Sequence, residues 1–457
     1  MGLGTFLACD PIEEEISTDS SLRLSASTDT VTFDTIFSSV GSITKRFRLF
    51  NPNEKAIELD RIYLGRGSDS PYAITVNGER GTSLTSEVIL GKDSLLVLVD
   101  VTIDPNDQNL PFLVKDSVII DFNGNSGDIK LVAWGQDAVF LNHEVIECNT
   151  IWDAKKPYVL SDTIVVDSEC KLTIEAGTQV YFDHSAELIV LGSLDVKGTA
   201  ENKVVFRNSR LDNRYDVAPG QWRGISFYNA SQNNTIDHAV IENAINGITL
   251  RPNEENEGSQ LKISNTSIRH MTNAGLFAYR GEVEAHNLEI IDCGAYMIAN
   301  IMGGDYQYDH CTFSNYPSNF SRDEPSAVFS NVLRDANGSV VYSFDLEVNM
   351  TNSIIWGDLD EELYLDIPET SNVTIETEGN IIRSKDESLV EQGNIISLAD
   401  NYPGFVSPSL VHFDYQLDSL ANARDAATNS TSTYDLLGTM RDSKPDIGAY
   451  ERKDSIQ

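Results

Sequence analysis

One register of residues recurs in the middle of the chain and constrains its fold more than any other feature. Four stretches align, namely DHAVIENAINGI from Asp237, SNTSIRHMTNAGL from Ser264, HNLEIIDCGAYM from His286 and DHCTFSNY from Asp309. The steps between their matching positions, Ala239, Thr266, Leu288 and Cys311, are 27, 22 and 23 residues long. A period this short, rich in β-branched residues and without a helical apolar stripe, predicts stacked β-rungs. The expected fold class is all-β, with a parallel β-helix solenoid.

The same register predicts two columns of side chains. Strands of successive rungs lie about 4.8 Å apart, so equivalent positions stack on one another. The apolar column should contain Ile241, Ile268, Ile290 and Phe313. The polar column beside it should contain His238, Asn265, Asn287, His310 and Asn352. We expect the polar column to be a ladder at a bend, where side chains bond backbone groups that the turn leaves unpaired.

The chain divides into four parts by its patterns. Residues 17–140 contain seven short β-rich runs separated by turns, from VTFDTIF at Val31 to IKLVAWG at Ile129, and predict an immunoglobulin-like β-sandwich. Residues 141–451 are assigned to the β-helix with its C-terminal cap, 1–16 to a signal remnant with an acidic tether, and 452–457 to a tail. Pro317 to Asn349 is expected to leave the coil. The sandwich and the ending PDIGAYE, Pro445 to Glu451, should cap the open strand edges.

The net charge limits the possible partners. With 70 acidic and 33 basic residues the formal charge is −37, which argues against nucleic acid, because phosphate binding needs clustered Lys and Arg. The charge is either a solubilising coat or a set of acidic loops that bind Ca²⁺. No other cofactor is expected. Cys148 and Cys170 flank one β-rich stretch and are able to pair in an oxidising compartment, whereas Cys293 and Cys311 are interpreted as small buried side chains.

Candidate catalytic residues are few. The register brings together ionisable side chains near the ladder, and the five weak candidates are Asp237, Arg269, His270, His286 and Asp309. Asp237, Ser264, His286 and Asp309 should form one column. These residues are either ladder neighbours and solvated turns or a catalytic or metal-binding face. A glycosidase needs two carboxyl groups on one face, and a lyase needs a base with charge neutralisation.

Aromatic side chains beside arginines form a second candidate site. The stretch NSRLDNRYDVAPGQWRG and the stretch GGDYQYDH supply the candidate ligand-binding residues Tyr215, Trp222, Arg223, Tyr306 and Tyr308. Exposed aromatic rings with arginines suit stacking on sugar rings or docking to a protein. The alternative is that Trp222 simply points into its rung.

Five segments resemble those of known protein families. The run FLACD followed by PIEEE resembles the end of a bacterial lipoprotein signal and the export signal of Bacteroidetes surface lipoproteins, which implies lipidation at Cys9. GTAENKVVF at Gly198, GQWRGI at Gly220 and the PDIGAYE ending resemble right-handed parallel β-helix proteins of the Bacteroidetes, in the pectate-lyase-like superfamily. Residues 17–137 resemble the small sandwich modules that precede larger domains in Bacteroidetes surface proteins.

These observations favour a surface lipoprotein over an enzyme. The resemblance implies palmitate-type acylation at Cys9, attachment to the outer membrane and a binding or assembly role for a glycan or a protein partner. One alternative is a polysaccharide lyase or glycosidase that acts in the lateral groove beside the Asp237–Asp309 column. Another is an accessory subunit of an outer-membrane nutrient importer, with a β-barrel complex as its partner.

Overall fold

The computed structural model describes residues 15–38, 40–106, 109–228, 231–253, 257–316, 322–368, 372–400, 402–409 and 412–453. Its elements are almost all β-strands, which confirms the all-β class. Two compact units divide at residue 138, and each is described by itself. Cys9 and nearly all of the predicted signal remnant and tether lie outside the described residues.

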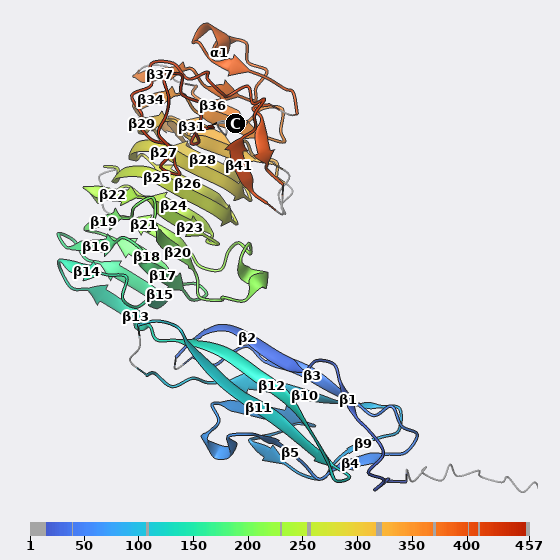
Figure 1. The fold of residues 1–457 in the computed structure, drawn as a ribbon. Helices are drawn as coiled ribbons and strands as arrows, with labels where there is room; N and C mark the ends of the chain where they lie inside the picture. The colour runs from blue at the N-terminus through green and yellow to red at the C-terminus, as the bar shows by residue number, and fades with distance from the viewer. Residues whose placement is uncertain are drawn as a thin grey trace, which may run out of the picture. The chain divides into compact units, whose positions relative to one another are not determined.

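The first unit is a β-sandwich of two five-stranded sheets (Figure 1). One sheet has the order β1 (Ser25–Ala26), β3 (Lys45–Phe50), β10 (Ser94–Val101), β6 (Tyr72–Val76) and β7 (Glu79–Gly81). The other has the order β2 (Thr30–Phe37), β12 (Asn125–Gln136), β11 (Phe112–Phe122), β5 (Arg61–Leu64) and β8 (Ser83–Leu84), and β4 (Ile57–Leu59) pairs with β9 (Glu87–Ile89). Buried and partly exposed residues alternate along β10, so this strand turns one face to the core of the sandwich.

The second unit is a coil of 25 parallel strands that stack in layers (Figure 1). Its strand pairings define three faces, which we call sheets A, B and C; each turn runs from A through B to C. Sheet A contains β14 (Thr150–Trp152), β16 (Lys171–Glu175), β19 (Ser193–Lys197), β22 (Asn234–Asp237), the first halves of β25 (Gln260–Met271) and β27 (Glu282–Cys293), β29 (Gly304–Asp309), β34 (Leu346–Thr351) and β37 (Val373–Glu378).

Sheets B and C complete each turn of the coil. Sheet B contains the first halves of β13 (Val139–Ile146) and β15 (Tyr158–Val166), then β17 (Gln179–Phe182), β20 (Val204–Asn208), β23 (Ala239–Glu242), the second halves of β25 and β27, β30 (Thr312–Asn315), β35 (Ile354–Gly357), β38 (Ile381–Ile382) and β39 (Ile395–Ile396). Sheet C contains the second halves of β13 and β15, then β18 (Glu187–Val190), β21 (Gly224–Phe227), β24 (Asn246–Leu250), β26 (Ala274–Tyr279), β28 (Tyr296–Ile301), β31 (Ala327–Ser330) and β36 (Leu363–Asp366).

The predicted register is confirmed in the coil. Ile241 pairs with Ile268, Ile268 with Ile290 and Ile290 with Phe313, and all four side chains are fully buried. Their column continues through Ile355 and Ile382. Burial of this continuous apolar stripe is what holds the rungs together.

The polar ladder also lies at a corner, between sheets A and B. His238, Asn265, Asn287, His310 and Asn352 all have φ between +48° and +52°. This left-handed conformation is one that Asn and His tolerate better than most residues, and it turns the chain sharply between two strands. Part of the bonding runs from side chain to side chain, since Asn287 Nδ2 donates to Asn265 Oδ1 at 3.0 Å.

The segment expected to leave the coil does so only in part. Residues 317–321 lie outside the described residues. The rest contains β31 of sheet C and β34 of sheet A, so that expectation was wrong for both strands. Only a hairpin of β32 (Val332–Arg334) and β33 (Val340–Ser343) projects from the coil. The last turn carries the short helix α1 (Ser388–Glu391), and β40 (Phe405–Ser407) pairs with β41 (Asp414–Leu417) beyond it.

Candidate functional site

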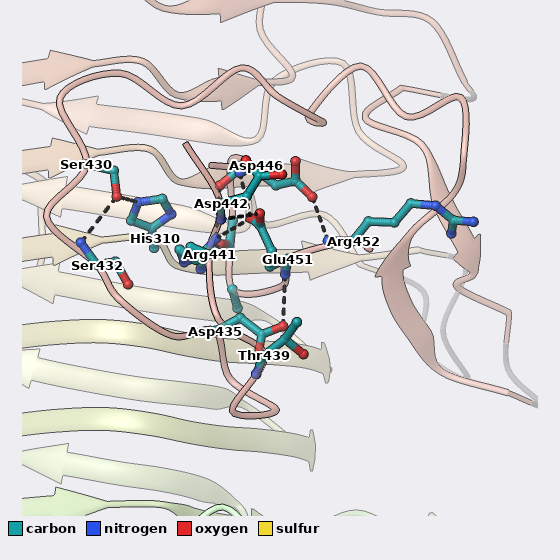
Figure 2. Close-up of polar contacts among 12 residues, drawn as sticks. His310, Ser430, Ser432, Asp435, Thr439, Arg441, Asp442, Asp446, Glu451 and Arg452 are labelled. Carbon is teal, nitrogen blue, oxygen red and sulfur yellow. Dashed lines mark hydrogen bonds and ion pairs between the residues drawn. The ribbon is translucent and has the colours of Figure 1, made fainter. Parts of the chain in front are cut away.

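Residues 412–453, which we call the C-terminal segment, lie across the outer side of sheet B and the ladder (Figures 1 and 2). The amide of Gly448 donates to the carbonyl of Asn352 at 2.8 Å, and the amide of Ala449 to Thr312 Oγ1 at 3.0 Å. The hydroxyl of Tyr450 donates to Glu289 Oε1 at 2.6 Å. PDIGAYE therefore packs along the flank of three rungs. The expectation that it caps the open end of the coil was wrong, because its hydrogen bonds go sideways to sheet B.

A buried polar network holds the C-terminal segment in this position (Figure 2). Arg441 and Glu451 are each about 1% exposed, with Nη1 and Oε2 3.5 Å apart. Arg441 Nη2 also donates to Asn287 Oδ1 of the ladder at 3.0 Å. The amide of Arg452 donates to Asp446 Oδ2 at 2.7 Å, yet burial raises the pKa of Asp446 to about 6. The network thus joins the C-terminal segment to the ladder through buried charged groups. Charged groups are tolerated in the interior only when they have hydrogen-bond or ion-pair partners of this kind.

The predicted column of sheet A residues is present beside the ladder. Asp237, Ser264, His286 and Asp309 occupy paired positions on successive rungs, and Thr351 follows them. His286 Nδ1 lies 3.1 Å from Asp309 Oδ2, and the hydroxyl of Thr351 donates to Asp309 Oδ1 at 2.9 Å. Although burial alone would raise it, the bond from His286 and the nearby His310 lower the pKa of Asp309. The side chains of His286 and Asp309 stay 36% and 32% exposed.

Two serines of the C-terminal segment meet the histidines of this corner. Ser432 Oγ lies 2.9 Å from His286 Nε2, and Ser430 Oγ lies 2.7 Å from His310 Nε2. Burial, with the charge of Arg441 nearby, lowers the pKa of His310 to about 4. Sequence reasoning missed both serines, because the segment has no repeat that places it against rungs more than 100 residues earlier.

Arg269 and His270 do not join the column. Both lie in the sheet B half of β25, on the far side of the corner. Arg269 Nε donates to Glu242 Oε1 at 2.8 Å, and His270 Nδ1 lies 2.7 Å from Asp292 Oδ2. His270 and Asp292 are each about 3% exposed, so no substrate reaches them. Among the five catalytic candidates, the structure therefore brings together only the column members.

Three of the aromatic candidates are interior residues, which corrects the prediction that they contact a ligand. Trp222 is fully buried, stacks on Phe182 with ring centres 3.8 Å apart and donates from Nε1 to the carbonyl of Glu242 at 2.7 Å. Tyr306 and Tyr308 are at most 1% exposed. Both tyrosines belong to the inward face of β29, where their hydroxyls bond other buried groups.

The other two aromatic-site candidates remain at the surface. The guanidinium of Arg210 lies 4.2 Å from the ring centre of Tyr215, which is partly exposed. Arg223 is 60% exposed and lies 3.9 Å from Glu187. Arg223 follows Trp222 directly in the chain but is exposed where Trp222 is buried, so the predicted set does not form one site.

The outer face of sheet C carries an aromatic surface that the sequence reading did not find. Thr249, Phe277, Ala299, Val328 and Tyr364 occupy one outward column in register. The ring centre of Phe277 lies 4.8 Å from that of Tyr279, in a stacked arrangement, and 6.4 Å from that of Tyr296. Tyr364 is 55% exposed at the end of the column. The rings of Phe277, Tyr279 and Tyr296 form a cluster, from which Ala299 and Val328 separate Tyr364 along the column. Partly exposed rings are suited to contact with the apolar faces of sugars.

An arginine, Arg251, lies within this surface, near Tyr228 and Tyr279. The guanidinium carbon of Arg251 lies 5.4 Å from the ring centre of Tyr228 and 5.5 Å from that of Tyr279. Its Nε is buried and has no hydrogen-bond partner within the described part of the chain. Stacking between two rings orients the guanidinium without using its hydrogen-bond donors. We call Tyr228, Arg251, Phe277, Tyr279, Tyr296 and Tyr364 the sheet C surface.

Other expectations concern metals, cysteines and membranes. Cys148 and Cys170 form a disulfide, with Cα atoms 4.5 Å apart, and the free Cys293 and Cys311 are buried. An acidic hollow of about 680 Å³ at the corner of sheets C and A is lined by Glu282, Asp305 and Glu347 among others, but no metal-binding group of three side chains occurs among the described residues. Ca²⁺ binding stays a prediction.

None of the described helices has the length and apolar character needed to cross a membrane.

Comparisons with known proteins support the coil. A family model described as a right handed beta helix region matches residues 131–315. No curated protein matches the chain. Similar solved structures include the ASH/PapD-like domain of human CEP192 (12% identity, 30% of this chain, 97% of that chain, TM-score 0.17) and a family 123 glycoside hydrolase from Clostridium perfringens (10%, 24%, 23%, 0.18). A third is the E. coli chaperone DraB (12%, 24%, 54%, 0.17). Scores this low carry no argument about function.

Proposed function

We propose that this chain is a cell-surface protein that binds carbohydrate on the sheet C surface. The observation that carries the proposal is the cluster of aromatic side chains around Arg251, in which Tyr228 and Tyr279 flank the guanidinium and Phe277 stacks on Tyr279. Such rings supply a stacking platform, while the guanidinium supplies hydrogen-bond donors for sugar hydroxyls or carboxylates. Rungs of fixed spacing hold the platform rigid, which reduces the entropy lost on binding.

The ionisation of the carboxyl groups in the sheet A column, Asp237 and Asp309, argues for binding rather than for glycosidic cleavage at that column. A glycosidase needs one protonated carboxyl group as its acid. Against the effect of burial, hydrogen bonds from His238, Asn265 and Ser264 lower the pKa of Asp237, and the pKa of Asp309 is lowered as well. Both carboxylates are therefore ionised at neutral pH. Arg269, a candidate lyase base, is engaged by Glu242.

A glycan array with the full chain tests this proposal. Tyr364→Ala should weaken binding to the retained glycan about tenfold or more, because loss of a stacking contact costs on the order of 1.4 kcal/mol. Trp134→Ala is the matched control, since Trp134 is an aromatic residue of the sandwich that is 45% exposed. Equal affinities for wild type and both variants would place binding elsewhere, and absence of binding to any glycan would refute the proposal.

The proposed location is the outer membrane, with a lipid on Cys9. Support comes from the FLACD run with its acidic continuation. The test is incorporation of a labelled fatty acid in cells, which should occur in wild type and disappear in Cys9→Ala. Co-purification of a β-barrel protein from native membranes would instead support the importer-subunit alternative.

A further inference from the structure

Ser432, His286 and Asp309 form a chain of three hydrogen-bonded side chains at the edge of the C-terminal segment. The two distances are 2.9 Å from Ser432 Oγ to His286 Nε2 and 3.1 Å from His286 Nδ1 to Asp309 Oδ2. Hydroxyl, imidazole and carboxylate are joined in the order that activates a serine nucleophile. All three are partly exposed, so a small substrate is able to approach. We propose that these residues form a serine hydrolase site that cleaves carboxylic esters.

The carboxylate sets the direction of proton transfer. Asp309 is oriented by the hydroxyl of Thr351 at 2.9 Å and is itself an acceptor for His286 Nδ1. With the proton on Nδ1, Nε2 is left as an acceptor. Ser432 is then the donor in its contact with Nε2, although its hydroxyl also lies 3.0 Å from the carbonyl of Tyr434. Rotation of the hydroxyl toward Nε2 gives the reactive arrangement.

The reaction that this geometry supports balances with water alone. Ser432 Oγ attacks the ester carbonyl while its proton passes to His286 Nε2. The intermediate collapses, the C–O bond to the alcohol breaks, and the alcohol leaves with the proton from Nε2. Water then attacks the acyl-serine with His286 again as base, which releases the acid and restores the hydroxyl. The amide of Thr433 follows the nucleophile directly and donates to no acceptor among the described residues, so it is a candidate to bind the oxyanion.

The neighbouring Ser430 and His310 give an internal control. Their contact is as short as that of Ser432 and His286, at 2.7 Å. However, His310 Nδ1 has no hydrogen-bond partner within the described residues, so no carboxylate orients that imidazole. The two serines of the C-terminal segment thus form two serine–histidine pairs. The pair of Ser432 and His286 has a carboxylate, that of Asp309, and the pair of Ser430 and His310 has none. Both pairs help to fix the segment, but only the first has the arrangement for catalysis.

The test uses the full chain, a fluorophosphonate probe and 4-nitrophenyl acetate. Peptide mass spectrometry should find the probe on Ser432 and not on Ser430. Ser432→Ala should abolish labelling, and His286→Asn should slow ester hydrolysis about 100-fold or more. Ser430→Ala should keep both activities, with a thermal midpoint shifted about as far as that of Ser432→Ala.

Labelling of the wild-type chain by the fluorophosphonate probe tests whether Ser432 is a nucleophile, even where a variant fails to fold. A folded wild-type chain without probe on Ser432, or with equal labelling of Ser430 and Ser432, would overturn the proposal and leave Ser432 as a structural contact. The result is separable from the proposed glycan binding, because 4-nitrophenyl acetate carries no sugar and Tyr364→Ala leaves the triad untouched.

Discussion

Sheets B and C belong to one coil, yet their outer faces differ. The outward side chains Ile354, Trp356 and Ile381 of sheet B are at most 1% exposed, because the C-terminal segment and the residues before it pack on them. On sheet C, the outward side chain Tyr364 of the last strand, β36, is 55% exposed, and the outward Phe277 is partly exposed. An identical backbone thus presents one face that serves stability and one that is available for recognition. The four predictions below test this division.

Removal of the chain after Asp400 should have the largest effect. It uncovers Ile354, Trp356 and Ile381, and burial of a large apolar side chain contributes about 1.5–3 kcal/mol, so the loss is roughly 5–9 kcal/mol. That loss is comparable to the whole stability of a typical domain. Soluble yield and the thermal midpoint measure it, and we expect aggregation. A monomeric truncated chain with the wild-type midpoint would show that sheet B does not depend on its cover.

Arg441→Met should cost about 3–5 kcal/mol, because it leaves the buried carboxylate of Glu451 without its cation. Arg251→Met on the open face is the matched control and should cost about 1 kcal/mol or less, the size of a stacked cation contact. Urea unfolding of both variants measures the difference. Equal losses would remove the contrast between the two faces.

His310→Asn should change how stability depends on pH. Burial holds the pKa of His310 at about 4 in the folded chain. Its unfolded value is near 6.5, so the unfolded chain binds the proton first. The free energy of unfolding of wild type should therefore fall by up to about 3 kcal/mol as pH falls from 6.5 to 4. His310→Asn, which introduces the residue found at most other ladder positions, should not show this loss.

Unfolding at pH 7 and at pH 4.5 measures this difference. The pKa of Asp446, raised to about 6, acts with the opposite sign: protonation of the folded chain adds stability as pH falls through 6. Because Asp446 is present in wild type and variant, its effect cancels in the comparison. Parallel pH profiles would show that His310 is not buried in its neutral form.

Tyr364→Ala should have the smallest effect on stability, within about 0.5 kcal/mol, since its ring is mostly exposed. The variant should nevertheless lose glycan binding, as described above. A loss of several kcal/mol in urea unfolding would mean that the sheet C surface is structural, like the cover of sheet B.

The sequence predicts what repeats in this molecule. The apolar column from Ile241 to Phe313 and the ladder were found because alternation and period place them without reference to distant residues. The same alternation also predicts which way the side chains of Tyr306 and Tyr308 face. In GGDYQYDH the charged or polar Asp305, Gln307 and Asp309 face outward, so the tyrosines between them must face inward.

The remaining features depend on contacts that no period encodes. Ser432 meets His286, and Arg441 meets Asn287, across separations of 146 and 154 residues. The C-terminal segment is irregular and has no repeat to align with the rungs. Its flanking position followed only from the coordinates, and so did the triad and the cover of sheet B. The sheet C surface could not be predicted from a repeat, because Thr249, Ala299 and Val328 share its outward column with the aromatic residues.

The flanking segment also imposes an order of assembly. The residues that seal sheet B follow every strand of the coil in the sequence, so the growing chain carries an open apolar wall until the residues up to Ile447 have been made. A chain that crosses a membrane during export meets the same delay on the far side. Until then, Ile354, Trp356 and Ile381 are the apolar side chains on which a chaperone or an aggregating partner would bind the incomplete chain.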